Sequence, residues 1–259
     1  MDAKLAGNRP RTEIHFHILP AIDDGPPTVD DSLYLADRAR RDGTGTIVAT
    51  PHVRTDFHAR VDDLPLRVKE LQSHVDRVGI PVALRVGAEL GHDMVGRLDQ
   101  RELDSIAQGP RGSRWLLVES PFDGFVDDFA AAIGELRDRG FATVIAHPER
   151  AAGVLDDGAL ALRRELAAGA VLQVNASSLL GRHGGPARDA GADLMRRFPV
   201  ALASDAHSPW KPPSLTDGIA AAIELGVPEA LARRAADSAP RALLRNGLAL
   251  PDVEPVLAA

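Results

Sequence analysis

The sequence predicts an α/β barrel in which seven parallel strands alternate with helices. Three observations support this fold class. Short apolar runs recur along the chain, and their continuous Val, Ile and Leu content is typical of parallel strands buried on both faces. Amphipathic stretches with helical periodicity separate most of these runs. The length of 259 residues, 44% of them hydrophobic, is sufficient for the core of one barrel domain.

The elements follow one another in a regular order. The expected strands are Ile14–Leu19, Thr46–Ala49, Val82–Val86, Trp115–Val118, Thr143–Ala146, Val171–Val174 and Val200–Ala203. The expected helices between them are Asp30–Asp42, Leu64–Val78, Val126–Arg139, Asp157–Ala168 and Ala187–Arg197. Gly43, Gly140 and Gly169 each follow a helix and precede a strand, as glycines that end helices do. The segment after the seventh strand predicts two or three closing helices.

We interpret residues 1–259 as a single domain, with residues 1–11 as a flexible N-terminus and Gly184–Pro186 as a loop. An open doubly wound sheet is the alternative architecture. Neither a GxGxxG motif nor a Walker loop is present to support nucleotide binding.

Composition excludes several classes of function. The chain has no cysteine, which rules out disulfides, thiolate metal sites and a cysteine nucleophile. Its net charge of −7 argues against nucleic acid as a partner, because binding to phosphates needs a basic face. No apolar run approaches the roughly 18 residues that span a bilayer, and no signal peptide is visible, so we expect no membrane insertion and a cytoplasmic location.

Side chains able to bind metal ions lie at the carboxyl ends of six of the seven strands. Glu13, His15 and His17 alternate along the first strand and therefore point to one face. The later strands end at His52, at Glu89, at Glu119, at His147 with Glu149 and Arg150, and at Asp205 with His207. In α/β barrels this end of the strands carries the chemistry.

A single histidine at a strand end is more often structural than a ligand, and His58, His74, His92 and His183 do not share the pattern. The cluster is less ordinary, because Glu89 and Glu119 would be costly to bury without partners. Imidazole and carboxylate ligands without sulfur suit manganese, iron(II), zinc or magnesium. About eight ligands indicate more than one ion, with Glu89 suited to bridge two of them.

The motifs at these positions are EIHFHILPAIDDGP, ATPHV, VGAEL, LVES, IAHPER, QVNASSLLGRHG and ASDAH. In this order, from about Glu13 to Gly247, they resemble the polymerase-and-histidinol-phosphatase (PHP) superfamily. Within it they are most similar to the bacterial capsular-polysaccharide tyrosine phosphatases. The HxH pair alone is weak, whereas DDGP, AHPER and SDAH together are specific to this branch.

The resemblance implies a distorted seven-stranded barrel and a manganese-dependent phosphotyrosine hydrolase with two or three ions. Its implied substrates are the tyrosine clusters of bacterial tyrosine kinases that control exopolysaccharide and capsule synthesis. The implied metal ligands are His15, His17, His52, Glu89, Glu119, His147, Asp205 and His207. Arg150 matches the arginine that holds phosphate, and Asp24 lies at the rim of the site.

Two positions depart from the family pattern. The first residue of the strand-one motif is usually Asp and here is Glu13, which is one methylene longer. Relatives commonly carry an arginine after the last strand, where this chain has SPWKPP with Lys211. Lysine binds phosphate as a point charge without a bidentate fork, so we expect a weaker contact with substrate there.

In the mechanism we expect, ion-activated water attacks phosphorus in line while Arg150 balances charge on the equatorial oxygens. His207 or water assists the leaving tyrosinate.

The alternatives are a histidinol-phosphate or other small-molecule phosphatase of the same superfamily, a metal-dependent amidohydrolase and a non-catalytic metal-binding module. Amidohydrolases usually place a lysine at a strand end, which this chain lacks. Specificity is expected in the loops Arg54–Arg60, Phe122–Asp127 and Gly181–Pro186, where Phe57, Phe122 and Phe125 lie, and at Trp210.

Overall fold

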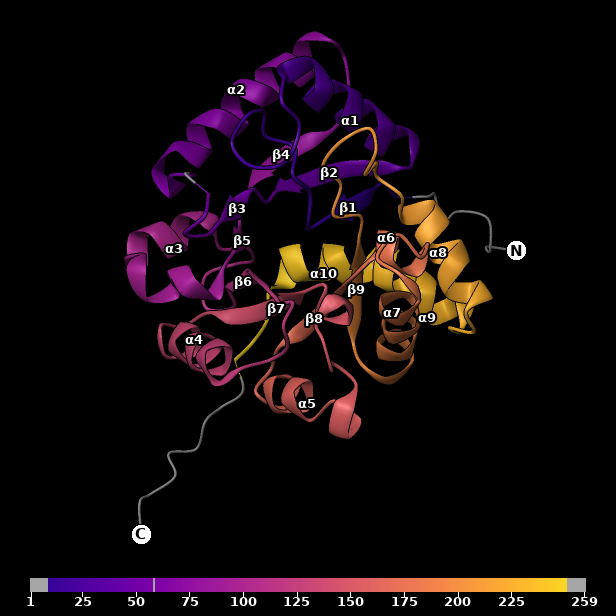
Figure 1. Ribbon diagram of the computed structural model, residues 1–259. Coiled ribbons are helices and arrows are strands. Elements are labelled where there is room, and N and C mark those ends of the chain that lie inside the picture. Colours follow the sequence, from indigo (N-terminus) through magenta and orange to yellow (C-terminus); the bar gives the residue numbers. More distant parts are fainter. Residues whose placement is uncertain (1–8, 58, 251–259) are drawn as a thin grey trace, which may run out of the picture.

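The computed structural model of this chain describes residues 9–57 and 59–250, and it contains two parallel sheets (Figure 1). One sheet has the order β1-β2-β4 and the other the order β3-β5-β6-β7-β8-β9. The strands are β1 (Arg11–Glu13), β2 (Thr44–Ala49), β3 (His52–Val53), β4 (Ala83–Val86), β5 (Glu89–Leu90), β6 (Trp115–Glu119), β7 (Ala142–Ala146), β8 (Val171–Asn175) and β9 (Val200–Ala203). Strand and helix alternate, as the sequence predicts.

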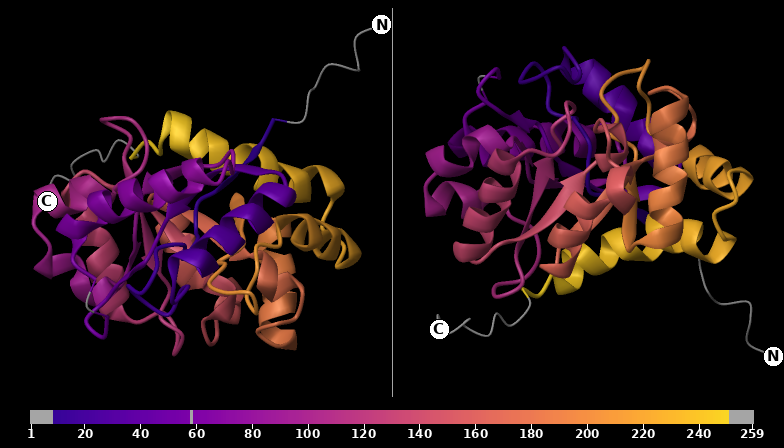
Figure 2. Two further views of the ribbon diagram at one scale, coloured as in Figure 1. Left: turned by 90° about the horizontal axis from the view of Figure 1, so that it is seen from above. Right: turned by 60° about the horizontal axis from the view of Figure 1, so that its bottom comes forward.

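Helices cover the outer faces of the sheets (Figures 1 and 2). They are α1 (Val29–Arg41), α2 (Leu64–Arg77), α3 (Gln100–Ile106), α4 (Asp127–Asp138), α5 (Leu160–Ala167), α6 (Ala176–Leu179), α7 (Gly185–Arg197), α8 (Leu215–Glu224), α9 (Glu229–Arg233) and α10 (Ala239–Asn246). A π-helical turn, Arg234–Ser238, joins α9 to α10. The expected closing helices are therefore confirmed as α8, α9 and α10.

The second and third predicted strands are confirmed as β2 and β4, but each is followed by a break and a further short strand, which accounts for the division into two sheets. The second strand breaks between β2 and β3, where Pro51 has no amide hydrogen to donate to a ladder. The third breaks between β4 and β5 at Gly87, where a Cβ atom would lie 2.5 Å from Cγ1 of Val48. Each break shifts the following residues into the second sheet, and β3 and β5 carry His52 and Glu89 at their first positions.

The first predicted strand, Ile14–Leu19, was misplaced. The ladder of β1 with β2 ends at Glu13, because the next residues turn away to other partners. The amide of Phe16 donates to Oγ1 of Thr50 at 2.8 Å, and Phe16 forms an isolated parallel bridge with Ala206. This bridge joins the end of β1 to the segment after β9. A closed seven-stranded barrel ladder is not established by these pairings.

The inner face of the strands is apolar at its amino-terminal end. A cluster of buried residues there consists of Ile14, Val48, Trp115, Leu117, Ala142, Val144, Ala146, Ala201, Ala203 and Leu243. Leu243 belongs to α10, drawn in yellow along one side of the molecule in Figure 2. Nε1 of Trp115 donates to the carbonyl of Leu243 at 2.9 Å, so the helix covers this end of the strands. The outer faces pack on the helices through a second, larger apolar core.

The helices differ from the prediction most clearly at two boundaries and in one additional helix. The helix expected from Asp157 begins at Leu160, because Asp157 and Ala159 adopt left-handed φ values of 47° and 65°. The expected loop Gly184–Pro186 contains the first turn of α7, where proline is well tolerated. The unpredicted α3 begins with a capping box formed by Asp99 and Glu102, which the sequence DQRE offers.

Two further expectations concern the N-terminus and membrane insertion. Residues 1–8 of the expected flexible N-terminus, together with His58, lie outside the described residues, and Arg11 begins β1. Within residues 9–57 and 59–250 there is no helix with the length and apolar content needed to traverse a bilayer.

Candidate metal centre

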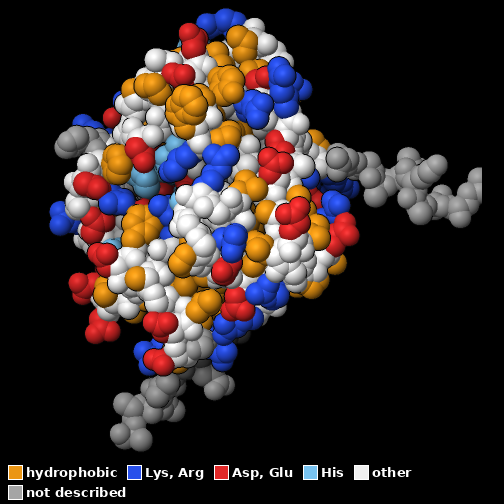
Figure 3. Space-filling model, turned by 45° about the vertical axis from the view of Figure 1, so that its right-hand side comes forward, with side chains coloured by type: hydrophobic (Ala, Val, Ile, Leu, Met, Phe, Trp, Pro, Cys, Tyr) orange, Lys and Arg blue, Asp and Glu red, His pale blue; other side chains and the backbone are white. Residues whose placement is uncertain are grey.

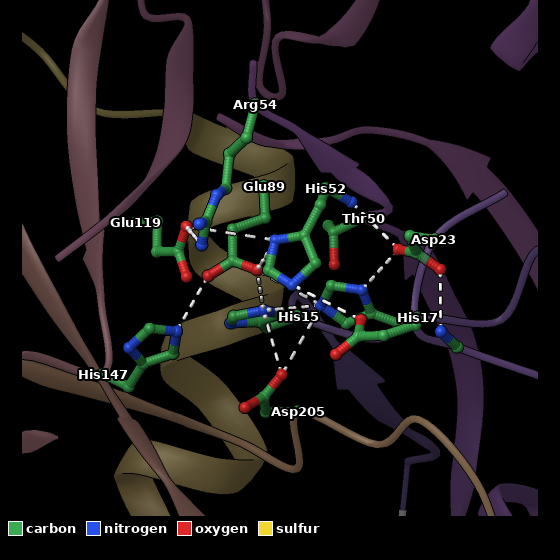
Figure 4. A network of polar contacts seen from close by, with 12 residues as sticks. His15, His17, Asp23, Thr50, His52, Arg54, Glu89, Glu119, His147 and Asp205 are labelled. Atoms are coloured by element: carbon green, nitrogen blue, oxygen red, sulfur yellow. Dashed lines mark hydrogen bonds and ion pairs between the residues drawn. The ribbon is translucent and has the colours of Figure 1, made fainter. Parts of the chain in front are cut away.

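The side chains at the carboxyl ends of the strands converge in one place (Figure 4). Nε2 of His15 lies 3.2 Å from Nε2 of His17, although neither histidine belongs to the ladder of β1. Four groups have ligand atoms close enough to share an ion: His17 with Asp24, His52 and His207; His15 with His147 and Asp205; His15 with His17 and Glu89; and His52 with Glu89 and Glu119. These groups include all eight residues predicted as metal ligands, and they add Asp24.

Glu89 occupies the centre of this cluster. Its Oε2 lies 3.0 Å from Nδ1 of His52, 3.2 Å from Nε2 of His15 and 3.3 Å from Nε2 of His17. Its Oε1 is 2.8 Å from Nε2 of His147. The carboxylate therefore contacts histidines through both oxygens, and it would suit a ligand shared between two ions.

Three histidines have Nδ1 next to an oxygen acceptor, and this arrangement orients Nε2 into the cluster. The acceptors are Oε1 of Gln173 for His15, Oδ2 of Asp23 for His17 and the carbonyl of Asp205 for His207, at 2.7 to 2.8 Å. When Nδ1 donates its proton to such an oxygen, Nε2 presents a lone pair. Outer partners of this kind fix the tautomer and orientation of metal-binding histidines.

The cluster contains buried atoms that find no hydrogen-bond partner in the described part of the chain. They are Nδ1 of His52, Oε2 of Glu89, Nδ1 of His147 and Oδ1 of Asp205. Leaving buried polar atoms unsatisfied costs about 1–3 kcal/mol each, and more when they are charged. Cations bound between the carboxylates and the imidazoles would satisfy Glu89, Asp205 and His52. The donor set therefore fits metal ions.

The backbone is unusual at two of these positions. His147, directly after β7, has φ 34°, and Asp205, two residues after β9, has φ 52°. A left-handed conformation is uncommon for residues other than glycine and typically costs about 1–3 kcal/mol when the surroundings impose it. Here it turns a side chain into the cluster at the end of each strand.

The DDGP turn supports His17 from the solvent side. Oδ2 of Asp23 contacts Nδ1 of His17 and accepts the amide of His52 at 2.9 Å, and its Oδ1 accepts the amide of Gly25. Asp24 points the other way, with Oδ1 3.3 Å from Nε2 of His207. A Cβ atom on Gly25 would lie 3.0 Å from the carbonyl oxygen of His17, so the turn requires glycine for this close approach.

The pKa values of the carboxylates in the site are shifted in opposite directions. Burial would raise the pKa of Glu89, but the adjacent His15 and His52 and the hydrogen bond with His147 keep it well below its usual value. Burial also opposes ionisation of Asp205, whose pKa is nevertheless lowered, chiefly by His15 and His207. For Glu119, burial and the charge of Glu89 raise the pKa to about 7. A cation beside Glu119 would favour its ionised form.

Glu13 is buried below the cluster and belongs to none of the four groups. Its Oε2 accepts the amide of Ser204 at 3.0 Å, next to Asp205 in the chain, and burial raises its pKa to about 8. In this structure Glu13 contacts the segment that carries a ligand, which is a supporting position.

A cavity of about 210 Å³ opens over the cluster, and cationic side chains line it together with the ligands. In the space-filling view of Figure 3, histidines are visible between Lys, Arg and hydrophobic side chains on this face. NH1 of Arg150 lies 3.6 Å from Oδ2 of Asp205, and Lys211 also lines the cavity. Arg54 is committed to Glu119, 2.7 Å away, and to Asp56.

Glu149 lies apart from the cavity and does not hold Arg150. Its Oε1 accepts the hydroxyl of Ser178 at 2.7 Å and the amide of Asn175 at 3.0 Å. His74 lies on α2, and His92 begins a short 3-10 helix, so neither joins the cluster, as the sequence indicates.

Sequence reasoning missed several residues around the ligands: Asp23, Arg54, Gln173, Asn175 and His183. Gln173 and Asn175 alternate along β8, and Asn175 donates to Oδ2 of Asp205 at 2.7 Å. Their two-residue spacing at the end of an otherwise apolar strand was the available signal. Asp23 was visible as the first acidic residue of DDGP. No local pattern marks Arg54 or His183.

The chain matches the family model described as capsular polysaccharide synthesis, CpsB/CapC, over residues 11–245. Tyrosine-protein phosphatase YwqE of Bacillus subtilis is 31% identical over 205 residues, which are 76% of this chain and 77% of that protein. CapC of Staphylococcus aureus, whose name assigns it provisionally to the tyrosine-protein phosphatases, is 30% identical over 201 residues, 76% of each chain.

Solved structures of other proteins are also similar to this chain. A crystal structure from work on YwqE of Bacillus subtilis and CpsB of Streptococcus pneumoniae, described as metal-dependent tyrosine phosphatases, superimposes with a TM-score of 0.79. It is 26% identical and covers 92% of this chain and 96% of that one. The phosphotriesterase homology protein of Escherichia coli, 13% identical with a TM-score of 0.58, shares the fold; the match covers 88% of this chain and 96% of that one.

Proposed function

The chain belongs to the CpsB/CapC family of capsular polysaccharide synthesis, and we propose that it is a metal-dependent protein tyrosine phosphatase. The observation that carries this proposal is the position of Glu89, whose carboxylate contacts four histidines from three separate segments of the chain. A buried carboxylate in that position is suited to hold two cations close together, as hydrolysis of phosphate esters requires.

The chain's own residues divide into groups that hold ions and groups that hold the phosphate. His15, His17 and His207 present Nε2 to the ions because their Nδ1 atoms lie against oxygen acceptors. Asp24 is proposed to join the ion-holding groups through Oδ1, which faces both His52 and His207.

Arg150 is proposed to bind the phosphate. Its guanidinium lies at the wall of the cavity near Asp205, and its planar fork matches two phosphate oxygens. Lys211 adds a second positive charge to the same cavity as a point donor.

The reaction proposed is in-line hydrolysis of the phosphate ester. Ions in this centre would make hydroxide available near neutral pH and balance the charge that builds up on the phosphate oxygens. Tyrosinate, with a pKa of about 10, is a better leaving group than an alkoxide and needs less protonation. His207, which lines the cavity with Nε2 3.3 Å from Oδ1 of Asp24, or water is proposed to assist the leaving tyrosinate.

Manganese is the ion we propose, in two or three copies, because four ligand groups combine imidazole with carboxylate and contain no sulfur. Magnesium, iron(II) and zinc remain alternatives for the same donors. We also propose that the two sheets form the distorted seven-stranded barrel of the PHP superfamily, with β2 and β3 sharing one strand position and β4 and β5 sharing another. The bridge of Phe16 with Ala206 supports this.

The proposed substrate is a phosphotyrosine-bearing protein, and the partner is a bacterial tyrosine kinase that controls capsule or exopolysaccharide synthesis. This rests on the names of the relatives, which are tyrosine-protein phosphatases of a capsule-synthesis family.

The test starts from protein stripped of metal with a chelator and dialysed. We expect no turnover of p-nitrophenyl phosphate or of a phosphotyrosine peptide, and recovery with Mn²⁺ above that with Mg²⁺ or Zn²⁺. Histidinol phosphate, assayed in parallel, should be the poorer substrate. Arg150→Ala should lose activity while Arg111→Ala, an exposed arginine outside the cavity, keeps it. Full activity of the metal-free protein would refute the proposal.

A further inference from the structure

An apolar pocket lies beside the metal centre and shares a wall with it. The pocket has a volume of about 530 Å³, and most of its lining is small or aliphatic, including Ala152, Val154, Leu155 and Ala190. Its ionisable lining residues are Glu149, Arg150 and His183, and Oε1 of Glu149 already accepts hydrogen bonds from Ser178 and Asn175. Phe122 and Arg150 line both this pocket and the cavity over the cluster. Anything held by Arg150 in the metal cavity therefore has direct access to apolar surface.

Phe122 lies between the apolar pocket and the cavity over the cluster. Its ring stacks on the ring of His147, with centroids 5.7 Å apart, and the guanidinium of Arg150 lies 4.4 Å above it. Yet 42% of Phe122 is exposed, although a free phenylalanine gains by burial. The ring therefore contacts two residues of the site, and its exposed part is available to a ligand.

The metal cavity is too small for a whole aryl phosphate. Its volume of about 210 Å³ must hold the ions and the phosphate, and charged side chains line most of it. A benzene ring fits a cavity of about 150 Å³ when the walls are apolar. The neighbouring pocket has that room and that lining, and it opens to solvent between exposed Phe122, Ala152 and Pro186.

A second neighbouring cavity, of about 520 Å³, is the competing location, and its chemistry is unfavourable to a phenyl ring. It also contacts Phe122 and Glu119, but Asp56, Asp93 and Asp123 line it. Burying a hydrocarbon ring beside ionised carboxylates would remove water from them without offering partners.

We propose that the pocket behind Arg150 is the subsite for the aromatic leaving group, and that Phe122 is a specificity-determining residue that stacks on the phenyl ring of phosphotyrosine. The inference rests on the proposed phosphatase function and specifies its substrate class as aryl phosphates whose peptide chain leaves through the open side of the pocket.

The experiment compares manganese-loaded wild type with Phe122→Ala and Phe122→Leu. We expect KM for a phosphotyrosine peptide to rise about tenfold in Phe122→Ala and less in Phe122→Leu, because ring stacking is lost in both but apolar area remains in the second. Inhibition by inorganic phosphate reports on the ions, Arg150 and Lys211, and its Ki should change less than KM, because Phe122 contacts only the edge of that machinery through Arg150 and His147.

Variants that fill one pocket or the other test where the phenyl ring of the substrate binds. Ala152→Leu narrows the apolar pocket from an exposed position and should raise KM for the peptide. Asp123→Leu narrows the acidic cavity and should have little effect, and Ala130→Leu, on the exposed face of α4, controls for stability. An equal change of KM and of phosphate Ki in Phe122→Ala, or a larger effect of Asp123→Leu than of Ala152→Leu, would overturn the subsite. Absence of turnover of every phosphoester by the loaded wild type would instead refute the phosphatase function itself.

Discussion

The two ends of the same strands have opposite chemistry although both are buried. Strand β6 turns Trp115 and Leu117 into the apolar cluster beside α10, and two residues later it ends at Glu119 in the metal centre. Strand β7 places Ala142 and Val144 in the apolar cluster and leads into His147. At one end burial itself is favourable, at roughly 25 cal/mol per Å² of apolar surface. At the other end burial is unfavourable until ligands satisfy the polar atoms.

This contrast teaches that stability and function are separable along one strand. The apolar end should determine whether the chain folds, and the polar end should determine what it binds. The largest expected effect therefore lies at the apolar end. Trp115→Ala removes a fully buried ring and its hydrogen bond to Leu243, and should lower the free energy of unfolding by about 3–5 kcal/mol, measured by urea denaturation.

At a temperature where Trp115→Ala is still folded, its phosphatase activity per folded molecule should match that of the wild type. A loss of activity as steep as the loss of stability would break the separation between the two ends. Trp115→Phe, which keeps most of the apolar volume, should lie between the two proteins in stability.

Glu89→Gln changes the polar end without changing its shape. The charge proposed to hold two ions together is removed, and ion-based stabilisation of the transition state is worth several kcal/mol, so kcat should fall about 100-fold or more. Circular dichroism and urea denaturation should remain close to those of the wild type. Glu70→Gln, at an exposed position on α2, is the matched control, and unfolding of Glu89→Gln would show that the polar end is needed for the fold.

Asp23→Asn tests the outer contacts of the metal centre. Asn still accepts a hydrogen bond from His17 but carries no charge to fix the ring, so metal affinity should fall about 10- to 100-fold, measured by titration calorimetry with Mn²⁺. Asp128→Asn, exposed in the first turn of α4, should leave the affinity unchanged. An unchanged affinity in Asp23→Asn would mean that the turn shapes the backbone alone.

Lys211→Arg should have the smallest effect, and it tests how the polar end of the strands binds phosphate. A guanidinium can bind two phosphate oxygens where an ammonium binds as a point charge, so KM for the phosphotyrosine peptide should fall a few-fold with kcat unchanged. Steady-state kinetics at fixed Mn²⁺ measures this. A higher KM would indicate that the cavity is shaped for the shorter reach of lysine.

Sequence alone could predict which side chains gather in the candidate metal centre, because they follow apolar runs and the carboxyl ends of parallel strands meet at one edge. His52 and Glu89 lie in the cluster at the first positions of β3 and β5. The breaks before these two strands were not predicted, because each interrupts a ladder over only two residues, Thr50 with Pro51 and Gly87 with Ala88. The misplaced first strand has a similar cause: Ile14 and Phe16 have strand-like character, but their partners come from elsewhere in the fold.

The outer contacts were harder to predict, because they depend on side-chain directions that no spacing specifies. Gln173 reaches His15 from a position 158 residues away in the chain, and Arg54 reaches Glu119 across two loops. Asp24 was predicted at the rim of the site, but no spacing in the sequence indicates that its Oδ1 faces His52 and His207.

The chain contains two tryptophans, and their positions give each end of the strands its own optical reporter. Trp115 is fully buried and should emit at short wavelength, shielded from acrylamide. Trp210, 85% exposed and next to Lys211, should emit at long wavelength and be quenched readily. Fluorescence of the unlabelled protein can thus follow denaturation through one indole and occupancy of the cavity mouth through the other.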